Sequence, residues 1–195
     1  PLLFVVVGHE ISNDRGIALT EEHDIVYRDH PRPGELGSVT QIAPTDCSWE
    51  RTVEPDDALL FRYSALTFNA HRIHYDRRYA TETEGYSGLV VHGLLLATFL
   101  VDLVRRHCHE AEISAFRFRA LMPLFDGNTI GLRGRVGGDR KTIALWASNE
   151  SGELAVEAEA IRLTVAVLCA EDVPMGVVSI WLMVSLSTRS PWCSS

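Results

Sequence analysis

Lysine is nearly absent from this chain of 195 residues, in which Lys141 is the only one. Arginine supplies the other basic side chains, and 18 basic residues against 26 acidic ones give a formal net charge of −8. An acidic chain without a long basic run is a poor candidate for binding the phosphate backbone of a nucleic acid. Guanidinium groups suit bidentate binding of anions. GC-rich coding also produces a preference for arginine over lysine, so the arginines alone identify no ligand.

Long apolar runs and paired cysteines are also lacking. The stretch 89–104 contains His92 and Asp102, and the stretch 163–186 is interrupted by Pro174, so neither supplies the ~20 uninterrupted apolar residues of a membrane span. The four cysteines follow no CxxC spacing, which favours free thiols in a reducing compartment. We therefore expect a soluble, cytoplasmic protein without a membrane partner, or a mitochondrial one if a eukaryotic targeting segment has been lost.

Turn residues and strand-like runs divide the chain into four parts, enough for one domain and part of another. Residues 1–29 hold two strand-like pieces around an Asn-Asp-Arg-Gly turn at 13–16. A linker rich in proline and glycine, 30–47, leads to the main unit at 48–165, and 166–195 is an irregular tail. Because a single hairpin is not stable alone, we expect residues 1–29 to pair with further strands.

The main unit predicts one buried helix followed by antiparallel strands. Ser87 is a plausible N-cap for an apolar helix that ends at Arg105 and Arg106, whose charges suit the negative end of the helix dipole. Farther along, apolar and charged residues alternate over 116–120 and 153–163, as in half-buried antiparallel strands. This order predicts an α+β fold in which a sheet wraps round a helix.

Histidines gather just before and at the start of this helix, at His71, His74 and His92. Histidine titrates near neutral pH and therefore suits proton transfer. The pair His92-Gly93 stands at the helix start, where unpaired backbone N–H groups can stabilise a developing oxyanion. The pattern indicates a proton carrier beside an oxyanion hole, although surface histidines and a hydrogen-bonded core histidine would give the same pattern.

Two stretches resemble a known family. Residues 62–76 (RYSALTFNAHRIHYD) resemble the signature of the MaoC-like (R)-specific hydratases and dehydratases, in the branch of the hydroxyacyl-thioester dehydratase type two and the mesaconyl- or itaconyl-CoA hydratases. Residues 86–95 (YSGLVVHGLL) resemble the point where the family's long helix begins after a His-Gly pair. The resemblance implies the hotdog fold, a curled antiparallel sheet around one long helix. It also implies the C-terminal half of a truncated double hotdog, with residues 1–29 left from the N-terminal half.

The chemistry that the resemblance implies is reversible elimination of water from a 3-hydroxyacyl thioester of coenzyme A or acyl-carrier protein. The family motif places an aspartate five residues before its catalytic histidine, which puts His74 at the histidine position and Asn69 at the aspartate position. Asparagine cannot accept a proton, so Asn69 would hold water or orient His74, and His71 becomes the candidate second acid/base group. The resemblance further implies that the Gly93 N–H donates to the thioester oxygen.

Further predictions concern substrate contacts, cofactors and partners. We expect substrate contacts from four residues, which are Tyr63, Arg72, Val91 and His92. Asp76 is expected to be a structural cap or an orienting residue. No metal or redox cofactor is expected, because coenzyme A or phosphopantetheine arrives as part of the substrate. The expected partners are the acyl thioester, an acyl-carrier protein, and a second subunit, in a homodimer or hetero-oligomer formed through the hotdog sheet.

Three alternatives stay open. A hotdog thioesterase would share the oxyanion site and would want a carboxylate aimed at the thioester carbon, for which Asp102 is the candidate on the helix. A catalytically degenerate hotdog subunit of a hetero-oligomer would explain Asn69. A zinc site built from His71, His74 and His92, or from His107 and His109, would be unusual, because metal hydrolases show tighter motifs such as HExxH.

Overall fold

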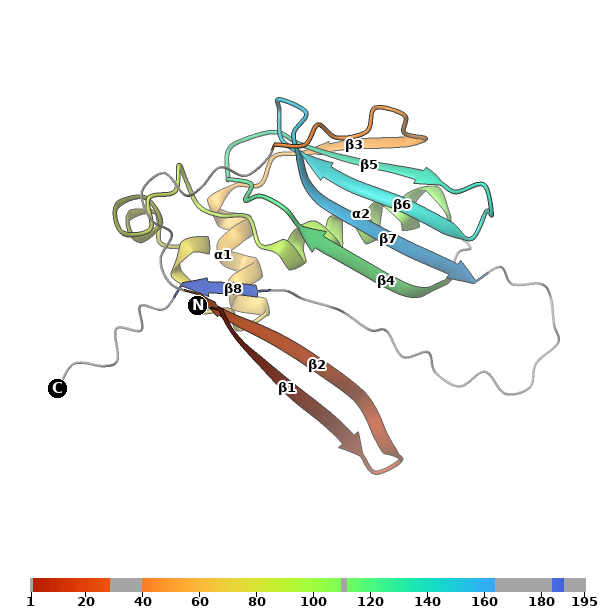
Figure 1. Ribbon diagram of the computed structural model, residues 1–195, viewed down its shortest axis with the longest axis horizontal. Coiled ribbons are helices and arrows are strands. Elements are labelled where there is room, and N and C mark those ends of the chain that lie inside the picture. The colour runs from red at the N-terminus through yellow and green to blue at the C-terminus, as the bar shows by residue number, and fades with distance from the viewer. Residues whose placement is uncertain (1, 29–39, 110–111, 164–183, 188–195) are drawn as a thin grey trace. The chain divides into compact units, whose positions relative to one another are not determined.

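The computed structural model describes residues 2–28, 40–109, 112–163 and 184–187, which belong to two compact units (Figure 1). One unit contains residues 1–39 and 172–195, and the other contains residues 40–171. Most of the predicted linker and of the predicted irregular tail lies outside the described residues. The division of the chain into the four parts expected from the sequence therefore stays a prediction.

The smaller unit contains the hairpin expected near the N-terminus. Strand β1 (Leu2–Asn13) pairs antiparallel with β2 (Gly16–Arg28), and Gly16 has a φ of 117° in the turn between them. Positive φ at this turn suits glycine, which has no Cβ to clash. Strand β8 (Val184–Ser187) pairs parallel with β2. The hairpin therefore has a third strand beside it, as the argument from stability required.

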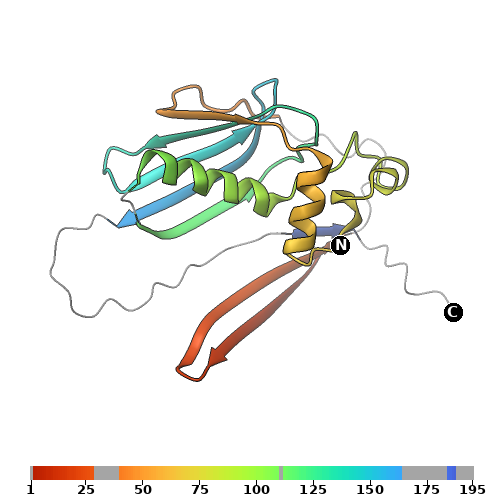
Figure 2. The same cartoon turned by 180° about the vertical axis from the view of Figure 1, so that it is seen from behind.

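The larger unit contains a five-stranded antiparallel sheet in the order β3-β5-β6-β7-β4. Its strands are β3 (Trp49–Val53), β4 (Glu112–Ala120), β5 (Ile130–Val136), β6 (Thr142–Ser148) and β7 (Leu154–Leu163). Helix α2 (Gly93–His107) lies along one face of this sheet (Figures 1 and 2). The buried helix followed by antiparallel strands is the order that the sequence predicted, whereas β3, which precedes α2, was not predicted.

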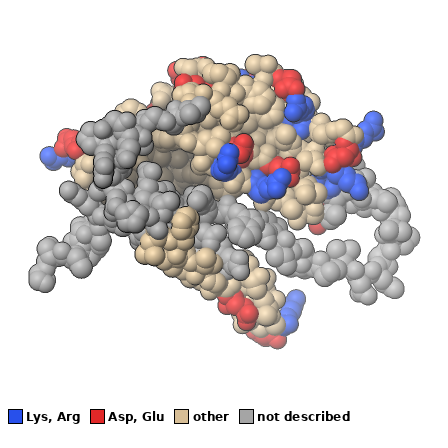
Figure 3. Space-filling view, in the orientation of Figure 1, with Lys and Arg blue, Asp and Glu red and all other residues tan. Residues whose placement is uncertain are grey.

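The core of the larger unit lies between α2 and the sheet. Leu100 and Leu103 of the helix are fully buried, as are Ile143 and Leu145 of β6. The opposite face of the sheet is charged, and Figure 3 shows basic and acidic side chains interleaved on the side that Figure 1 presents. Arg117 and Arg119 on β4 form ion pairs with glutamates of β7. One face of the sheet is thus buried against the helix and the other carries the charged side chains, which explains the alternation in the sequence. Trp146 of β6 is an exception, because it is buried with Ala43 and Leu154.

Helix α2 begins at Gly93, five residues later than the predicted start at Gly88, directly after Ser87. The intervening segment does not join the helix, because its backbone groups form hydrogen bonds with distant parts of the chain. Val90 forms a β-bridge with Phe125, and the Val91 N–H donates to the Leu124 carbonyl at 2.8 Å. This segment separates α2 from the helical elements before it, which are α1 (Asp57–Leu66), a 3₁₀ turn (Arg72–His74) and a π-helical turn (Tyr79–Thr83).

Two predictions about compartment can be compared with the described residues. Cys47 and Cys108 are free thiols, as their spacing predicted. No helix within the described part of the chain is long and apolar enough to cross a membrane.

Candidate functional site

The histidine-rich loop follows α1, which Asp56 caps by accepting the Leu59 N–H at 2.7 Å. The chain leaves this helix through Phe68, whose φ of 52° is left-handed. The loop then folds on itself, because the Asn69 N–H donates to the Ser64 carbonyl at 2.9 Å and Asn69 Oδ1 accepts the His71 N–H at 3.0 Å. These bonds fix the entry into the 3₁₀ turn that carries His74.

His74 is buried, with 8% of its surface exposed, and its Nδ1 lies 2.7 Å from the Val90 carbonyl oxygen. A carbonyl can only accept, so Nδ1 carries the hydrogen and the neutral ring presents its lone pair on Nε2. Burial lowers the pKa of His74 below its ordinary value, against a smaller opposite effect of the bond to Val90, and His71 lowers it further. His74 is therefore a neutral base at physiological pH, with a fixed tautomer.

His92 stacks on His74, with ring centroids 3.8 Å apart and ring planes 16° from parallel. Its Nε2 is hydrogen bonded to Ser64 Oγ at 2.8 Å, and Tyr63 packs against it edge-on at 4.9 Å. His92 is buried, with 2% of its surface exposed, and burial lowers its pKa to about 3, with smaller contributions from His74 and His71. His92 is thus neutral and braces the 3₁₀ turn against α1 rather than capping α2 with its side chain.

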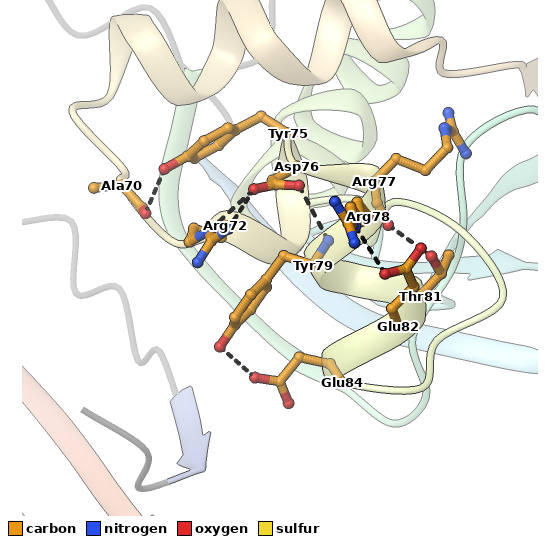
Figure 4. A network of polar contacts seen from close by, with 10 residues as sticks. All are labelled: Ala70, Arg72, Tyr75, Asp76, Arg77, Arg78, Tyr79, Thr81, Glu82 and Glu84. Atoms are coloured by element: carbon orange, nitrogen blue, oxygen red, sulfur yellow. Dashed lines mark hydrogen bonds and ion pairs between the residues drawn. The ribbon is translucent and has the colours of Figure 1, made fainter. Parts of the chain in front are cut away.

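His71 completes the group, edge-on to His74 with ring centroids 5.5 Å apart. Burial lowers the pKa of His71, and the nearby negative charge of Glu84 raises it by less. Glu84 is itself held by the Tyr79 hydroxyl, which donates to Oε1 at 2.7 Å (Figure 4). The three histidines that the sequence singled out therefore come together in one cluster.

Gly93 is the first residue of α2, directly after His92. Its N–H belongs to the first turn, whose amide groups have no carbonyl partner within the helix. The N–H has no hydrogen-bond partner among the described residues. A Cβ at this position would lie 3.9 Å from Phe118 Cε2, which is ordinary contact. The site thus places an amide donor without a partner among the described residues at the positive end of the helix dipole, directly after the His92 ring that stacks on His74.

The remaining predicted residues surround the cluster. Val91 is buried, and its N–H is used by the Leu124 carbonyl. Arg72 lies over the Tyr79 ring at 4.2 Å and pairs with Asp76 at 2.7 Å (Figure 4). Asp76 also accepts the Tyr79 N–H at 3.0 Å, which agrees with its expected capping role. The substrate contacts predicted for Tyr63, Arg72, Val91 and His92 stay predictions.

Two parts of the site were missed in the sequence. Neither Ser64, which holds His92, nor the Val90 carbonyl, which sets the tautomer of His74, was predicted to take part. A serine inside a helix and a backbone carbonyl carry no recognisable signal in one sequence. Each acts across a long separation, 28 residues for Ser64 and His92 and 16 for His74 and Val90.

The residues of the two alternative sites, the zinc site and the thioesterase carboxylate, are not arranged among the described residues as those sites would require. Among the described residues, no three His, Cys, Asp or Glu side chains are grouped as metal ligands would be. Asp102 on α2 is engaged by Arg51 at 2.6 Å and by Arg106 at 2.7 Å. It lies nine residues after Gly93, which along a helix is about 13 Å from the free amide.

The comparison with protein families decides the identity of the chain. The model of the family "hydroxyacyl-thioester dehydratase type 2" matches residues 2–126. The chain belongs to this family. The resemblance noted in the sequence is thereby confirmed.

Individual relatives in this family are longer than the chain. A mesaconyl-C(4)-CoA hydratase of Chloroflexus aurantiacus is 48% identical over 158 residues, which are 81% of this chain and 55% of that protein. A mitochondrial hydroxyacyl-thioester dehydratase type 2 of Schizosaccharomyces pombe is 42% identical over 117 residues, which are 59% of this chain and 36% of that protein. The chain thus spans about half the length of the Chloroflexus protein and less of the yeast one.

Solved structures identify the fold. The (R)-hydratase of A. caviae involved in PHA biosynthesis has a TM-score of 0.52 at 19% identity, and the match covers 65% of this chain and 98% of that one. The R-hydratase PhaJ1 of Pseudomonas aeruginosa has a TM-score of 0.53 at 19% identity, over 71% of this chain and 92% of that one. The predicted α+β hotdog, an antiparallel sheet around one central helix, is confirmed.

Proposed function

We propose that this chain catalyses the reversible hydration and dehydration of enoyl and 3-hydroxyacyl thioesters of coenzyme A or acyl-carrier protein. The observation that carries the proposal is the pairing of a neutral, tautomer-fixed His74 with the free Gly93 amide at the start of α2. A base and an oxyanion donor are the two groups that proton removal next to a thioester carbonyl requires. Family membership and the hydratase named as a relative support the same chemistry.

In the dehydration direction, His74 Nε2 takes the proton from C2 of the 3-hydroxyacyl thioester. The electron pair of the broken C–H bond moves toward the carbonyl, and the Gly93 N–H donates to the oxygen as negative charge develops there. The new imidazolium keeps its Nδ1–H bond to the Val90 carbonyl, which favours the charged ring. The electron pair then forms the C2–C3 double bond as the bond from C3 to the hydroxyl breaks.

The departing hydroxyl needs a proton to leave as water, and His71 is the candidate donor beside His74. Burial lowers the pKa of His71 on balance, and the negative charge of Glu84 offsets part of that effect by favouring the protonated form. Asn69 is the candidate to hold the departing water. Its Oδ1 is already used by the His71 N–H, so its amide NH₂ group is the part left to donate to an oxygen.

The thioesterase alternative ranks lower. Asp102 would have to leave two arginines to act on a thioester, and it stands far along α2 from the Gly93 amide. The degenerate-subunit alternative rests on Asn69 and is tested with the main proposal.

Partners and location are part of the proposal. A second hotdog subunit is proposed because one solved neighbour, with a TM-score of 0.53, is the ChsH1–ChsH2 complex of Mycobacterium tuberculosis. Coenzyme A or phosphopantetheine is proposed to enter with the substrate rather than as a resident cofactor. A cytoplasmic location is proposed, or a mitochondrial one, as in the name of the S. pombe relative.

The direct test is turnover of crotonyl-, mesaconyl- and itaconyl-CoA by the purified chain. We expect enoyl absorbance to fall through hydration, without release of free thiol. Thiol release with unchanged enoyl absorbance would replace the proposal with a thioesterase. Inactivity alone, with activity restored by a second hotdog subunit, would replace it with the degenerate subunit.

The pH dependence of this turnover is expected to show the lowered pKa of His74. Catalysis needs the neutral ring, and burial stabilises that form, so activity is lost only when the pH falls below the ordinary histidine value of 6.5. The acidic limb of kcat/KM should therefore have its midpoint below pH 6.5. A midpoint at or above that value would contradict the assignment of His74 as the base.

A further inference from the structure

The extended segment 88–91 carries both the acceptor for His74 and the connection to α2. The Val90 carbonyl accepts the His74 Nδ1–H at 2.7 Å, and the Val90 N–H donates back to the Ile73 carbonyl at 3.0 Å. The next peptide is fixed to the Leu124 carbonyl. Small displacements of this segment would change both the hydrogen bond to His74 and the position of the Gly93 N–H at the start of α2.

Asp126 holds the same segment through two hydrogen bonds to Leu89. Its Oδ1 accepts the Leu89 N–H at 2.8 Å, and its own N–H donates to the Leu89 carbonyl at 3.0 Å. The Asp126 side chain is 7% exposed. A Cβ on residue 88 would lie 2.8 Å from Oδ1, so glycine at this position lets the carboxylate approach the backbone.

Arg77 connects Asp126 back to the histidine loop. Its guanidinium forms an ion pair with the Asp126 carboxylate, in which Nη1 lies 3.3 Å from Oδ1 and Nη2 contacts Oδ2 more closely. Arg77 stands three residues after His74 in the chain. Figure 4 shows its side chain directed away from the ion pairs made by Arg72 and Arg78. The loop with the base and the segment with its acceptor are therefore joined twice, through Val90 and through this ion pair.

We propose that Arg77 and Asp126 form a positioning pair for His74, which keeps the Val90 carbonyl in line with His74 Nδ1–H by fixing segment 88–91 against the histidine loop. Neither residue touches the reacting atoms; both act through the backbone of Leu89 and Val90. The inference rests on the proposed function insofar as it assigns a catalytic consequence to this geometry.

The expected direction of change follows from the groups around His74. The titratable groups against it are His71 from its own loop and His92 at the start of α2, with Glu84 acting through His71. The Val90 carbonyl favours the protonated ring, so a weaker bond to Val90 lowers the pKa of His74. Loss of a nearby positive charge would by itself raise that pKa. The two effects therefore have opposite signs.

The test compares Arg77→Gln with Arg78→Gln. Arg78 is a matched control, because it is the neighbouring arginine and its ion pair with Glu82 is at the surface, where 84% of the Arg78 side chain is exposed. We expect R77Q to move the titration of His74, followed by NMR in the free protein, to lower pH by about 0.5–1 unit, the equivalent of one weakened hydrogen bond. R78Q should leave it in place or move it slightly upward.

Turnover gives a second measurement. R77Q should lower kcat about tenfold with little change in KM, since a misplaced base slows chemistry more than binding. Asp126→Asn keeps an oxygen for the Leu89 N–H but loses the charge, and should move the titration in the same direction as R77Q. A His74 titration that is unchanged or raised in R77Q would overturn the positioning pair, because loss of the Asp126 negative charge would by itself lower the pKa of His74 in the Asp126→Asn variant. The titration needs no turnover, so a chain without hydratase activity would refute the proposed function and still test this inference.

Discussion

Replacement of His74 by alanine is expected to lower kcat for enoyl-thioester hydration by about 10²–10⁴-fold. The variant loses the Nε2 lone pair, which is the proton acceptor that burial and the Val90 bond keep available. Steady-state assay of purified wild type and variant measures the effect. His109→Ala is the matched control, because it removes an exposed imidazole beyond the end of α2, and it should keep wild-type turnover.

A second substitution at the same position distinguishes a catalytic role of His74 from a structural one. His74→Asn keeps an amide N–H that can donate to the Val90 carbonyl but has no basic nitrogen. It should lose as much activity as the alanine variant while it unfolds at nearly the wild-type temperature. Near-normal turnover by the asparagine variant would show that His74 orients the loop and that another group moves the proton.

Gly93→Pro is expected to lower kcat by about 10²–10³-fold, the usual loss when one donor to a developing oxyanion is removed. Proline has no N–H, yet it is favoured at the first position of a helix, where the amide has no helical partner. The residue before it must be extended, and His92 already has φ −60° and ψ 133°. The substitution thus removes one amide donor from a helix start that can accept proline.

Gly93→Ala is the control for the side chain added at this position. Its Cβ would meet Phe118 at 3.9 Å, which requires no displacement, and its N–H is retained. The alanine variant should keep activity within about threefold of wild type, because it retains the donor. Equal losses in the two variants would assign the effect to the side chain and would refute the amide as oxyanion donor.

Much of the fold was predictable because its elements carry local patterns. The apolar run from Leu94 to Val104 and the alternation in β7 are short-range signals of a buried helix and a half-buried strand. The start of α2 was wrong for a non-local reason. Ser87 is a good N-cap residue, but the following residues are drawn into an extended segment by hydrogen bonds to Leu124 and Asp126.

The grouping of the three histidines was predictable in its residue types and not in its geometry. Imidazoles followed by a His-Gly pair indicated His71, His74 and Gly93, and family resemblance aligned them. The stack of His92 on His74 and the contribution of Asp126 arise from contacts between distant parts of the chain. Asp126 stands in an Asp-Gly-Asn sequence that indicates a turn. The turn signal gives no indication that Asp126 accepts the Leu89 N–H.

The parallel stacking of His74 and His92 limits how many protons the site can hold. Two imidazolium rings 3.8 Å apart would repel each other, and the pKa of His92 of about 3 leaves that ring uncharged through any cycle near neutral pH. The pair can therefore hold a single proton, on His74. In the proposed reaction, a proton taken from C2 must leave His74 before the next one can be accepted, so each turnover has to return the two rings to their uncharged state.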